Sequence, residues 1–436
     1  MEKISIAGPA ELLAVLPYHL GFQPRRSVLV ACFTGRRMEL VVRLDVVPPG
    51  RAAAAAAEVI PPVLDAAPDW AFVVGYEDVV GECRPLSEAL AAALGLEGIG
   101  VAGRVTVRGG RWFCLTCDEC PPEGAPLPED ADVPGVAGYV GLGRAVLPRR
   151  EALGDLVEPL SGKDPRAAPL ARRIEAWVLA LAAARAAPLE PMVGGDIDDW
   201  GGDLDDAGDG ADDGYEEDGY REDDGYGDWT PSGAERLVDE ALGTWGLLLD
   251  GGLDEVLAPA GLRRSPSGEI GSPPSGRGSD VAGTALSVLA GSLRDHRLRD
   301  ALIAWLCPGM LSLELLEPDI VAGLQEFLGP RPPAAGCWDG TVGQGRARGG
   351  GGSGEWHADA LPDLVAARLE ALVRCVPAEH ATPVLALVAS HAWWRGDGAR
   401  AGVALDRALE LEPEHRLCLL LRKMVAQGIR LPARSA

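Results

Sequence analysis

Three stretches that are too polar or too rich in Gly and Pro to build a core divide this chain. Residues 196 to 228 hold sixteen Asp or Glu and one Arg, which is 15 of the 25 net negative charges of the protein. Such a run has too few apolar groups to offset the entropy that ordering would cost. Residues 258–280 and 329–356 consist mainly of Pro, Gly and Ser, a composition typical of linkers. We therefore expect ordered structure only outside these three stretches.

This division predicts five segments. We expect a mixed α/β domain over 1–188, an acidic disordered linker over 189–230, a helical segment over 231–328 interrupted by a disordered loop at 258–280, a Gly/Pro-rich disordered linker over 329–357 and a helical segment over 358–436. A calcium loop in the acidic run is the alternative, since alternating carboxylates can surround a hard cation. No register of the run supplies the full ligand set, so we favour a linker.

The first segment alternates strand and helix patterns. Short β-rich runs predict strands at 27–33, 38–46, 70–76, 99–107 and 111–117, with turns at 34–37 and 108–110. Helical patterns lie at 8–21, 51–67, 85–95, 134–146, 149–158 and 165–186. Two hairpins among alternating strands and helices predict a mixed sheet with flanking helices, not a purely parallel sheet.

The rest of the chain outside the linkers reads as helical. Apolar residues recur at helical spacing in two sets: Leu286, Leu289, Leu293, Leu302 and Leu306, and then Val365, Leu369, Leu372 and Val376. Near the end, the pair Gly396–Asp397 is followed by Ala401, Leu405, Ala408 and Pro413. That spacing resembles a tetratricopeptide helix hairpin, although one copy is too few for a repeat array. The fold class is therefore an α/β N-terminal domain followed by an all-α C-terminal domain.

Charge and hydropathy exclude several functions. The chain carries 65 Asp and Glu against 40 Lys and Arg, the wrong sign for binding nucleic acid. No run of 18 apolar residues and no signal-peptide pattern occurs, so we expect no membrane contact and a cytoplasmic protein. Neither the glycines of "GYVGLG" at 138–143 nor the six scattered histidines form a known binding motif. We therefore expect no cofactor and identify no catalytic residue.

Cysteines form the one concentrated group of reactive side chains. Cys114, Cys117 and Cys120 stand at equal three-residue spacing in "RWFCLTCDECPPEG". They are the candidate metal ligands, but a structural zinc needs four, and the fourth would come from Cys83, Asp118 or Glu119. An iron-sulfur run would need a cysteine where Gly124 stands. A redox pair is a further alternative, and structural thiols at a strand end are the interpretation that we favour, with only Cys117 and Cys120 close enough to share an ion.

Two other polar groups are weaker candidates. In "GFQPRRS", the residues Arg25, Arg26 and Ser27 could bind an anion at a strand edge, although we favour a structural loop. Arg43 and Asp45 alternate with apolar residues, so they share one face of the sheet and could pair or contact a ligand.

Several segments together resemble domain-of-unknown-function family 4192 of actinobacteria. The resemblance rests on "ELLAVLPYHLGFQPRRSVLV" at 11–30, "VVRLDVVP" at 41–48, "CDECPPEG" at 117–124, "LRDHRLRDALIAWL" at 293–306 and "WWRGDGARAGVALDRALELEPEHRLCLLL" at 393–421. It implies an α/β N-terminal part and a helical C-terminal part, and it implies no activity. In this chain the gap between Cys117 and Cys120 is shorter than in the related chains, which weakens any site carried over to these two residues.

Two classes of function remain. We expect a non-catalytic accessory protein that binds a protein partner through its C-terminal helices. The alternative is a small-ligand sensor or an enzyme that uses loops after Phe33, Tyr76 and Cys117, since open α/β sheets bind ligands beyond the carboxyl ends of their strands. A deep polar pocket that contains Asp45 and the cysteine loop would favour this alternative.

Overall fold

The computed structural model describes residues 8–35, 37–117, 120–141, 146–187, 232–258, 277–329, 331 and 361–427. The acidic run and nearly all of the two other predicted linkers lie outside these residues, and so does the alternative calcium loop. One boundary differs from the prediction: helix α9 (Arg277–Ser292) begins inside the stretch that we expected to be a loop.

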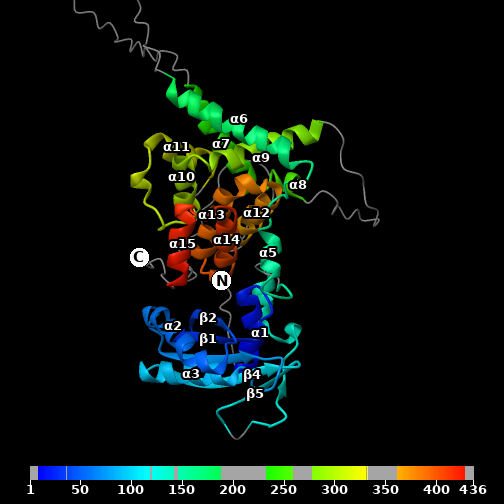
Figure 1. The fold of residues 1–436 in the computed structure, drawn as a ribbon, viewed down its shortest axis with the longest axis vertical. Coiled ribbons are helices and arrows are strands. Elements are labelled where there is room, and N and C mark those ends of the chain that lie inside the picture. Colours follow the sequence, from blue (N-terminus) through cyan, green and yellow to red (C-terminus); the bar gives the residue numbers. More distant parts are fainter. Residues whose placement is uncertain are drawn as a thin grey trace, which may run out of the picture.

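A six-stranded mixed sheet forms the N-terminal part, as predicted (Figure 1). Its order is β2-β1-β3-β4-β5-β6, and within it only β3 and β4 run parallel. The strands are β1 (Ser27–Thr34), β2 (Arg37–Asp45), β3 (Trp70–Tyr76), β4 (Gly100–Arg108), β5 (Arg111–Cys114) and β6 (Ala125–Pro126). The two-residue strand β6 was not predicted, because two residues are too few for any periodicity.

Helices cover both faces of this sheet. Helix α1 (Pro9–Leu20) packs Leu13 and Leu16 against Leu29 and Phe72 of the strands. The helices α2 (Ala52–Asp65) and α3 (Arg84–Leu96) cover the opposite face. Because both faces are covered, seven of the eight residues of β1 are buried, which explains its unbroken apolar sequence. The short helices α4 (Pro134–Gly141) and α5 (Ala152–Leu156) follow the sheet.

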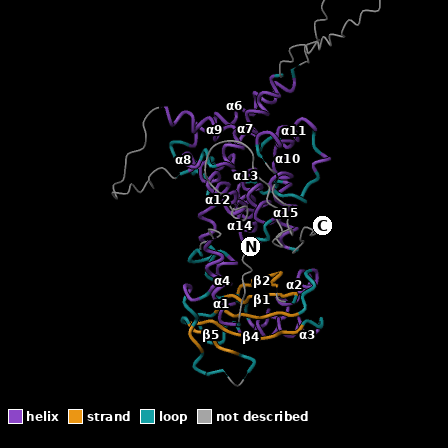
Figure 2. The backbone as a smooth tube through the Cα atoms, turned by 180° about the vertical axis from the view of Figure 1, so that it is seen from behind, coloured by secondary structure: helices purple, strands orange, loops and turns teal. Residues whose placement is uncertain are grey.

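The remaining described elements after α5 are helical and share one core, in agreement with the predicted fold class (Figure 2). They are α6 (Ala167–Ala186), α7 (Gly233–Asp250), α8 (Asp254–Leu257), α9, α10 (His296–Leu306), α11 (Pro318–Phe327), α12 (Leu361–Cys375), α13 (Ala378–Trp394), α14 (Gly398–Leu411) and α15 (Arg416–Ala426). Helices α13 and α14 form the predicted hairpin: Gly396 has a φ of 78°, and the Asp397 side chain accepts a hydrogen bond from the Arg400 backbone.

Helix α6 belongs to the helical core by its packing. Its residues Ile174, Trp177 and Leu181 contact the core built by α7 and α9. The sequence grouped this helix with the sheet, within 1–188, because it lies before the acidic run. Helical periodicity identifies an apolar stripe but not the core in which that stripe is buried.

Helix α5 connects the two parts. Leu153 is buried in the core beneath α1, while Leu156 packs against that core and against the helical core. Just after α5, the Leu160 backbone N–H donates to the Val376 carbonyl at 2.9 Å, and Glu158 pairs with Arg407 at 2.7 Å. Figure 1 shows α5 between the sheet below and the helices above.

Within the described residues, none of the helices combines the length and the apolar character that crossing a bilayer requires.

Candidate functional site

The cysteine loop leaves the sheet at the end of β5. Strands β4 and β5 are joined by Gly109 and Gly110, whose φ angles of 58° and 73° suit a tight hairpin turn. Cys114 is the last residue of β5 and pairs with Val105. The next backbone N–H, of Leu115, still donates to the Arg104 carbonyl at 2.9 Å. The first cysteine is therefore held by the sheet, as we expected.

Arg111 and Gly124 hold the far end of the loop. The Arg111 guanidinium donates to the carbonyl oxygens of Glu123 at 3.0 Å and Gly124 at 2.6 Å. Gly124 has a φ of 73°, and a Cβ at this position would lie 2.7 Å from the Phe113 ring. A side chain cannot occupy that space, so glycine is required for the close return to β5. The loop that carries the three cysteines is thus fixed to the sheet at both of its ends.

All three sulfur atoms converge. The Sγ atoms of Cys114 and Cys117 are 3.2 Å apart, and those of Cys117 and Cys120 are 3.1 Å apart. All three lie within 4.8 Å of one another. Our expectation that only Cys117 and Cys120 lie close enough to share an ion was wrong, because β5 ends at Cys114 and the chain turns there instead of continuing as a strand.

The environments of the outer two thiols differ. Partial burial raises the pKa of Cys114, but hydrogen bonds from Thr116 and Cys117 outweigh burial and bring this pKa down to about 7. The hydrogen bond with Cys117, together with desolvation, raises the pKa of Cys120 to about 12. One thiol of the group thus loses its proton readily and is stabilised as a thiolate by its neighbours.

The donor set suits a soft cation. Thiolates are preferred by zinc, copper(I) and iron-sulfur clusters. Sulfur atoms bound to one zinc at about 2.3 Å in a tetrahedron lie roughly 3.8 Å apart, so binding would require each close pair to open by about 0.6 to 0.7 Å. In the described part of the chain, this is the one group of three His, Cys, Asp or Glu residues close enough to hold an ion. Of the expected fourth ligands, Cys83 is buried elsewhere beneath β3, and Asp118 and Glu119 lie outside the described residues.

The structure separates the members of the Arg25–Arg26–Ser27 group. Arg26 forms an ion pair with Glu82 at 3.1 Å, and Ser27 is fully buried at the start of β1. Only Arg25 is exposed without a partner among the described residues. Arg43 and Asp45 pair with each other at 2.7 Å, as their spacing allowed.

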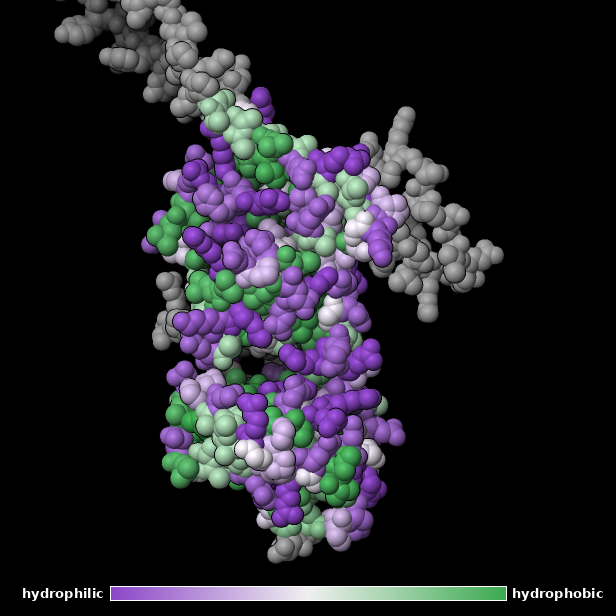
Figure 3. Space-filling model, in the orientation of Figure 1, coloured by the Kyte–Doolittle hydropathy of each residue, from purple (hydrophilic) through white to green (hydrophobic). Residues whose placement is uncertain are grey.

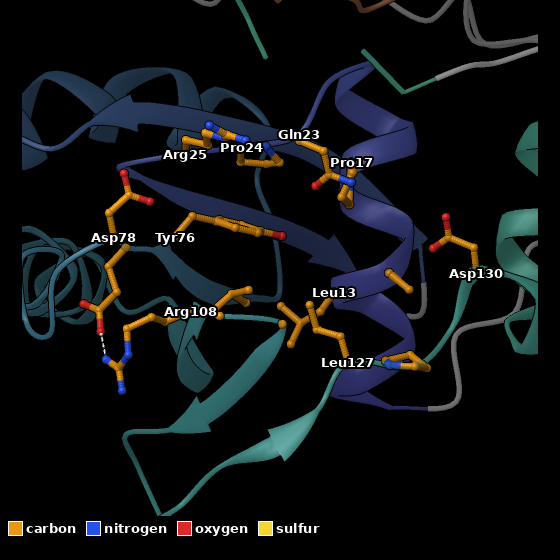
Figure 4. Close-up of a pocket in the computed structure, with 16 residues that line it drawn as sticks. Leu13, Pro17, Gln23, Pro24, Arg25, Tyr76, Asp78, Arg108, Leu127 and Asp130 are labelled. Atoms are coloured by element: carbon orange, nitrogen blue, oxygen red, sulfur yellow. Dashed lines mark hydrogen bonds and ion pairs between the residues drawn. The ribbon is translucent and has the colours of Figure 1, made fainter. Parts of the chain in front are cut away.

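A second concave site lies at the carboxyl ends of β3 and β4 (Figure 4). The cavity measures about 310 Å³ and includes Tyr76 and the residues that follow it, as the sequence suggested. It contains neither Asp45 nor the cysteine loop, which were also expected. The cysteine loop is absent because β5 runs antiparallel to β4, so Cys114 lies at the opposite end of the sheet from Arg108. Asp45 lies at the same end as Tyr76 but two strands away, on β2. The residues after Phe33 also lie at the other end, because β1 runs antiparallel to β3.

Together, the fold and these sites define a two-part protein, with a mixed α/β unit that carries a three-cysteine loop and a unit of packed helices. The family model described as "Domain of unknown function (DUF4192)" matches residues 9–310 and 355–431. The chain belongs to this family, and the match includes both parts and the cysteine loop. No curated protein and no solved structure matches the chain.

Proposed function

We propose that this protein is a non-catalytic accessory protein of a reducing, cytoplasmic compartment that binds a thiophilic metal ion, zinc foremost, through Cys114, Cys117 and Cys120. The observation that carries the proposal is the convergence of three Sγ atoms within 4.8 Å in a loop fixed at both ends. The odd number of nine cysteines supports a reducing compartment, because a disulfide framework pairs them.

Several features favour a bound ion over a purely structural role. Cys117 is exposed, so an ion can reach the group and a fourth position can be filled from solvent or from the loop itself. Core thiols of this chain, such as Cys307, are fully buried, and burial raises the pKa of Cys307. None of the three loop thiols is fully buried, and they contact each other.

Cobalt(II) titration of the reduced full-length chain tests this proposal. Cobalt replaces zinc in thiolate sites and gives a sulfur-to-metal charge-transfer absorption whose strength follows the number of thiolates. We expect one equivalent to saturate the band and zinc to displace it. The band should weaken in each single variant (C114S, C117S and C120S) and disappear in the C117S/C120S double variant.

Cys375→Ser is the matched control, because Cys375 is half-buried in the helical part and away from the loop. An absorption that persists in the double variant, or that Cys375→Ser reduces equally, would contradict the proposal. Disulfides that form between the loop cysteines in place of metal binding would favour the redox alternative.

A second candidate function is protein binding through the C-terminal helices. The α13–α14 hairpin resembles a tetratricopeptide unit, and the last helix, α15, exposes the adjacent residues Leu419 and Leu420 by 47% and 56%. A hydrophobic patch lies over α15 on the face drawn in Figure 3. Exposed apolar side chains that adjoin one another favour a contact surface over isolated exposure.

Affinity purification of the full-length chain tests this second function. A partner retained by the wild type should be lost from the L419E/L420E variant and kept by the control Leu96→Glu, which changes a leucine of α3 that is 88% exposed. Equal retention by all three proteins would place the partner elsewhere and reject the role of α15.

A further inference from the structure

The cavity at the ends of β3 and β4 is lined by five separate segments. Leu13, Ala14 and Pro17 of α1 form one wall, and Gln23, Pro24 and Arg25 come from the loop before β1. The residues Tyr76–Asp78 follow β3, and the turn after β4 meets Leu127, Pro128 and Asp130. At about 310 Å³, the cavity has the size of small-molecule sites at the lower end of their range.

Part of the lining is already fully bonded and serves as a rigid wall. The buried Glu77 carboxylate accepts from Arg108 at 2.6 Å and from the Gly81 backbone at 3.0 Å. Arg108 also lies over the Phe113 ring, with the guanidinium carbon 4.4 Å from its centroid. These contacts neutralise both charges, so neither is left to attract a ligand.

The Tyr76 hydroxyl is the group that the protein leaves unsatisfied. Tyr76 is only 7% exposed, and its hydroxyl oxygen is buried without a hydrogen-bond partner among the described residues. In Figure 4 its ring points into the middle of the lining residues, with the hydroxyl toward α1. A buried hydroxyl without a partner has lost its hydrogen bonds to water, and a bound molecule can restore one of them.

A backbone acceptor belongs to a residue of the same lining. Pro17 stands inside α1 and has no N–H, so the carbonyl of Leu13 lacks its helical donor. Leu13 and Pro17 both line the cavity. A helix interior rarely contains proline, because the missing hydrogen bond and the steric clash with residue i−4 both cost the helix stability. A ligand that donates to this carbonyl would offset part of that cost.

The free charges of the cavity are mainly negative. Asp78 has no partner for its carboxylate among the described residues, and Asp130 accepts one hydrogen bond, from the Tyr18 hydroxyl at 2.7 Å. In Figure 4, Asp78 lies on the side of Tyr76 away from α1, and Asp130 lies across α1 from the Tyr76 ring. Arg25 is the single cation of the lining that is not paired, and Arg26, which could have strengthened an anion site, is bound to Glu82.

We infer that this cavity binds a small organic amine, with one or two ammonium groups donating to Asp78, Asp130, Tyr76 and the Leu13 carbonyl. The unpaired charges of the lining are two carboxylates and one guanidinium, and an ammonium group supplies three donors and the charge opposite to that of the carboxylates. An anion would meet one cation and two carboxylates, so the lining disfavours it. This site is separate from the cysteine loop, and either proposal can fail without the other.

A matched series of linear probes tests the charge preference in the full-length chain. The diamine 1,6-diaminohexane, the neutral 1,6-hexanediol and the dianion adipate have nearly the same length. We expect the diamine alone to raise the thermal unfolding midpoint of the wild type in a saturable manner, since a ligand of the folded state stabilises it. Stabilisation by hexanediol or adipate equal to that of the diamine would overturn the proposal.

Three variants test the location of the site. The D78N/D130N and Tyr76→Phe variants should each bind the diamine about tenfold or more weakly, because the first removes the two negative charges that attract the ammonium groups and the second removes the hydroxyl acceptor. Asp239→Asn removes one negative charge from an exposed position on α7 and should leave binding unchanged. Equal weakening by Asp239→Asn would reveal only general attraction to an acidic protein, and unchanged binding in Tyr76→Phe would also reject the site.

The same tyrosine gives a measurement that needs no ligand. Tyr76→Phe removes an unpaired hydroxyl, so the unliganded midpoint should stay equal or rise. In the control Tyr139→Phe, the lost hydroxyl contacts His19 Nδ1 at 3.1 Å, and the midpoint should fall. A fall in Tyr76→Phe as large as that in the control would show that Tyr76 has a protein partner and would contradict the inference.

Discussion

At the residue scale, Gly124 determines whether the cysteine loop can return to the sheet. Its φ of 73° belongs to the left-handed region, and a Cβ would lie 2.7 Å from Phe113 Cε1 and 2.8 Å from the Trp112 carbonyl oxygen. The Trp112 carbonyl oxygen belongs to the backbone of β5, the strand that also carries Cys114. It therefore cannot move away from the added Cβ without displacing that strand. The geometry of the three sulfur atoms therefore depends on a residue that has no side chain.

Gly124→Ala should destabilise the protein and weaken cobalt binding together. Gly98→Ala is the control, because Gly98 has a similar φ of 78° but nothing within 4 Å of an added Cβ. The difference between the two variants isolates the steric clash, for which we expect about 1 to 3 kcal/mol in chemical denaturation. Equal stability of the two variants would show that the loop adapts without the strand.

His391 predicts a pH dependence at the same scale. Burial lowers its pKa from 6.5 to about 4 in the folded protein, while the unfolded chain keeps the ordinary value. Between pH 4 and pH 6.5 the His391 imidazole is protonated in the unfolded state and neutral in the folded state. The stability associated with the neutral, buried imidazole is therefore fully present above pH 6.5 and is lost as the pH falls toward 4. His391→Gln should remove at most roughly 2 to 3 kcal/mol of this decline. Stability measured against pH checks it, and the exposed His296→Gln should keep the wild-type slope.

At the element scale, helix ends are where local sequence determines structure most directly. The predicted turn before α14 follows from Gly396 in a left-handed conformation and from Asp397, whose side chain accepts from the Arg400 backbone at 2.9 Å. The Asp397 carboxylate also pairs with the Arg400 side chain at 3.2 Å. A cap and an ion pair at one residue stabilise the start of the second helix of the hairpin.

Asp397→Ala should therefore lower the free energy of unfolding by about 1 kcal/mol. Asp319→Ala is the control. It removes an acidic side chain from the first turn of α11, a helix whose N-terminus has no side-chain cap hydrogen bond. The measurement is the denaturation midpoint at constant slope. A loss no larger than that of the control would mean that packing of α13 on α14 fixes the helix start by itself.

The sequence predicted the long elements and missed short or context-dependent ones. Strands such as β1 and helices such as α1 have strong apolar patterns and clear end signals in Pro9 and Gly21. Strand β6 has two residues and exists because Arg111 and Trp112 pair with it. The same holds for the candidate site. The sequence showed the spacing of the three cysteines, but the approach of Cys114 to Cys117 depends on where β5 ends, which the sequence did not predict.

At the scale of the whole molecule, the end of α6 and the start of α7, which flank the acidic run in the sequence, lie side by side. A Cβ at Gly233, the first residue of α7, would lie 3.6 Å from the Cβ of Ala184 in the last turn of α6. The packing of α6 on α7 therefore does not depend on the length of the connection. Length and composition alone could not reveal this proximity, because it arises from the shared core.

Replacing residues 189–230 by a short Gly/Ser linker should thus leave the unfolding midpoint nearly unchanged, while removing 16 net negative charges. Thermal unfolding at low and high salt checks this prediction, since charge effects are screened by salt. As a control, the same linker replacing residues 157–163 should destabilise strongly, because it removes the Leu160 contact between the two parts. A loss of more than about 2 kcal/mol in the first variant would show that the acidic run packs or binds an ion.

The most direct test of the proposed metal site is the metal content of the full-length protein, purified under reducing conditions without added metal. We expect zinc or another thiophilic metal at close to one equivalent per chain, retained by Cys375→Ser and lost from the C117S/C120S double variant. A wild type that contains less than about a tenth of an equivalent, and that takes up none on dialysis against zinc, would contradict this proposal. The three cysteines would then be structural thiols at the end of β5.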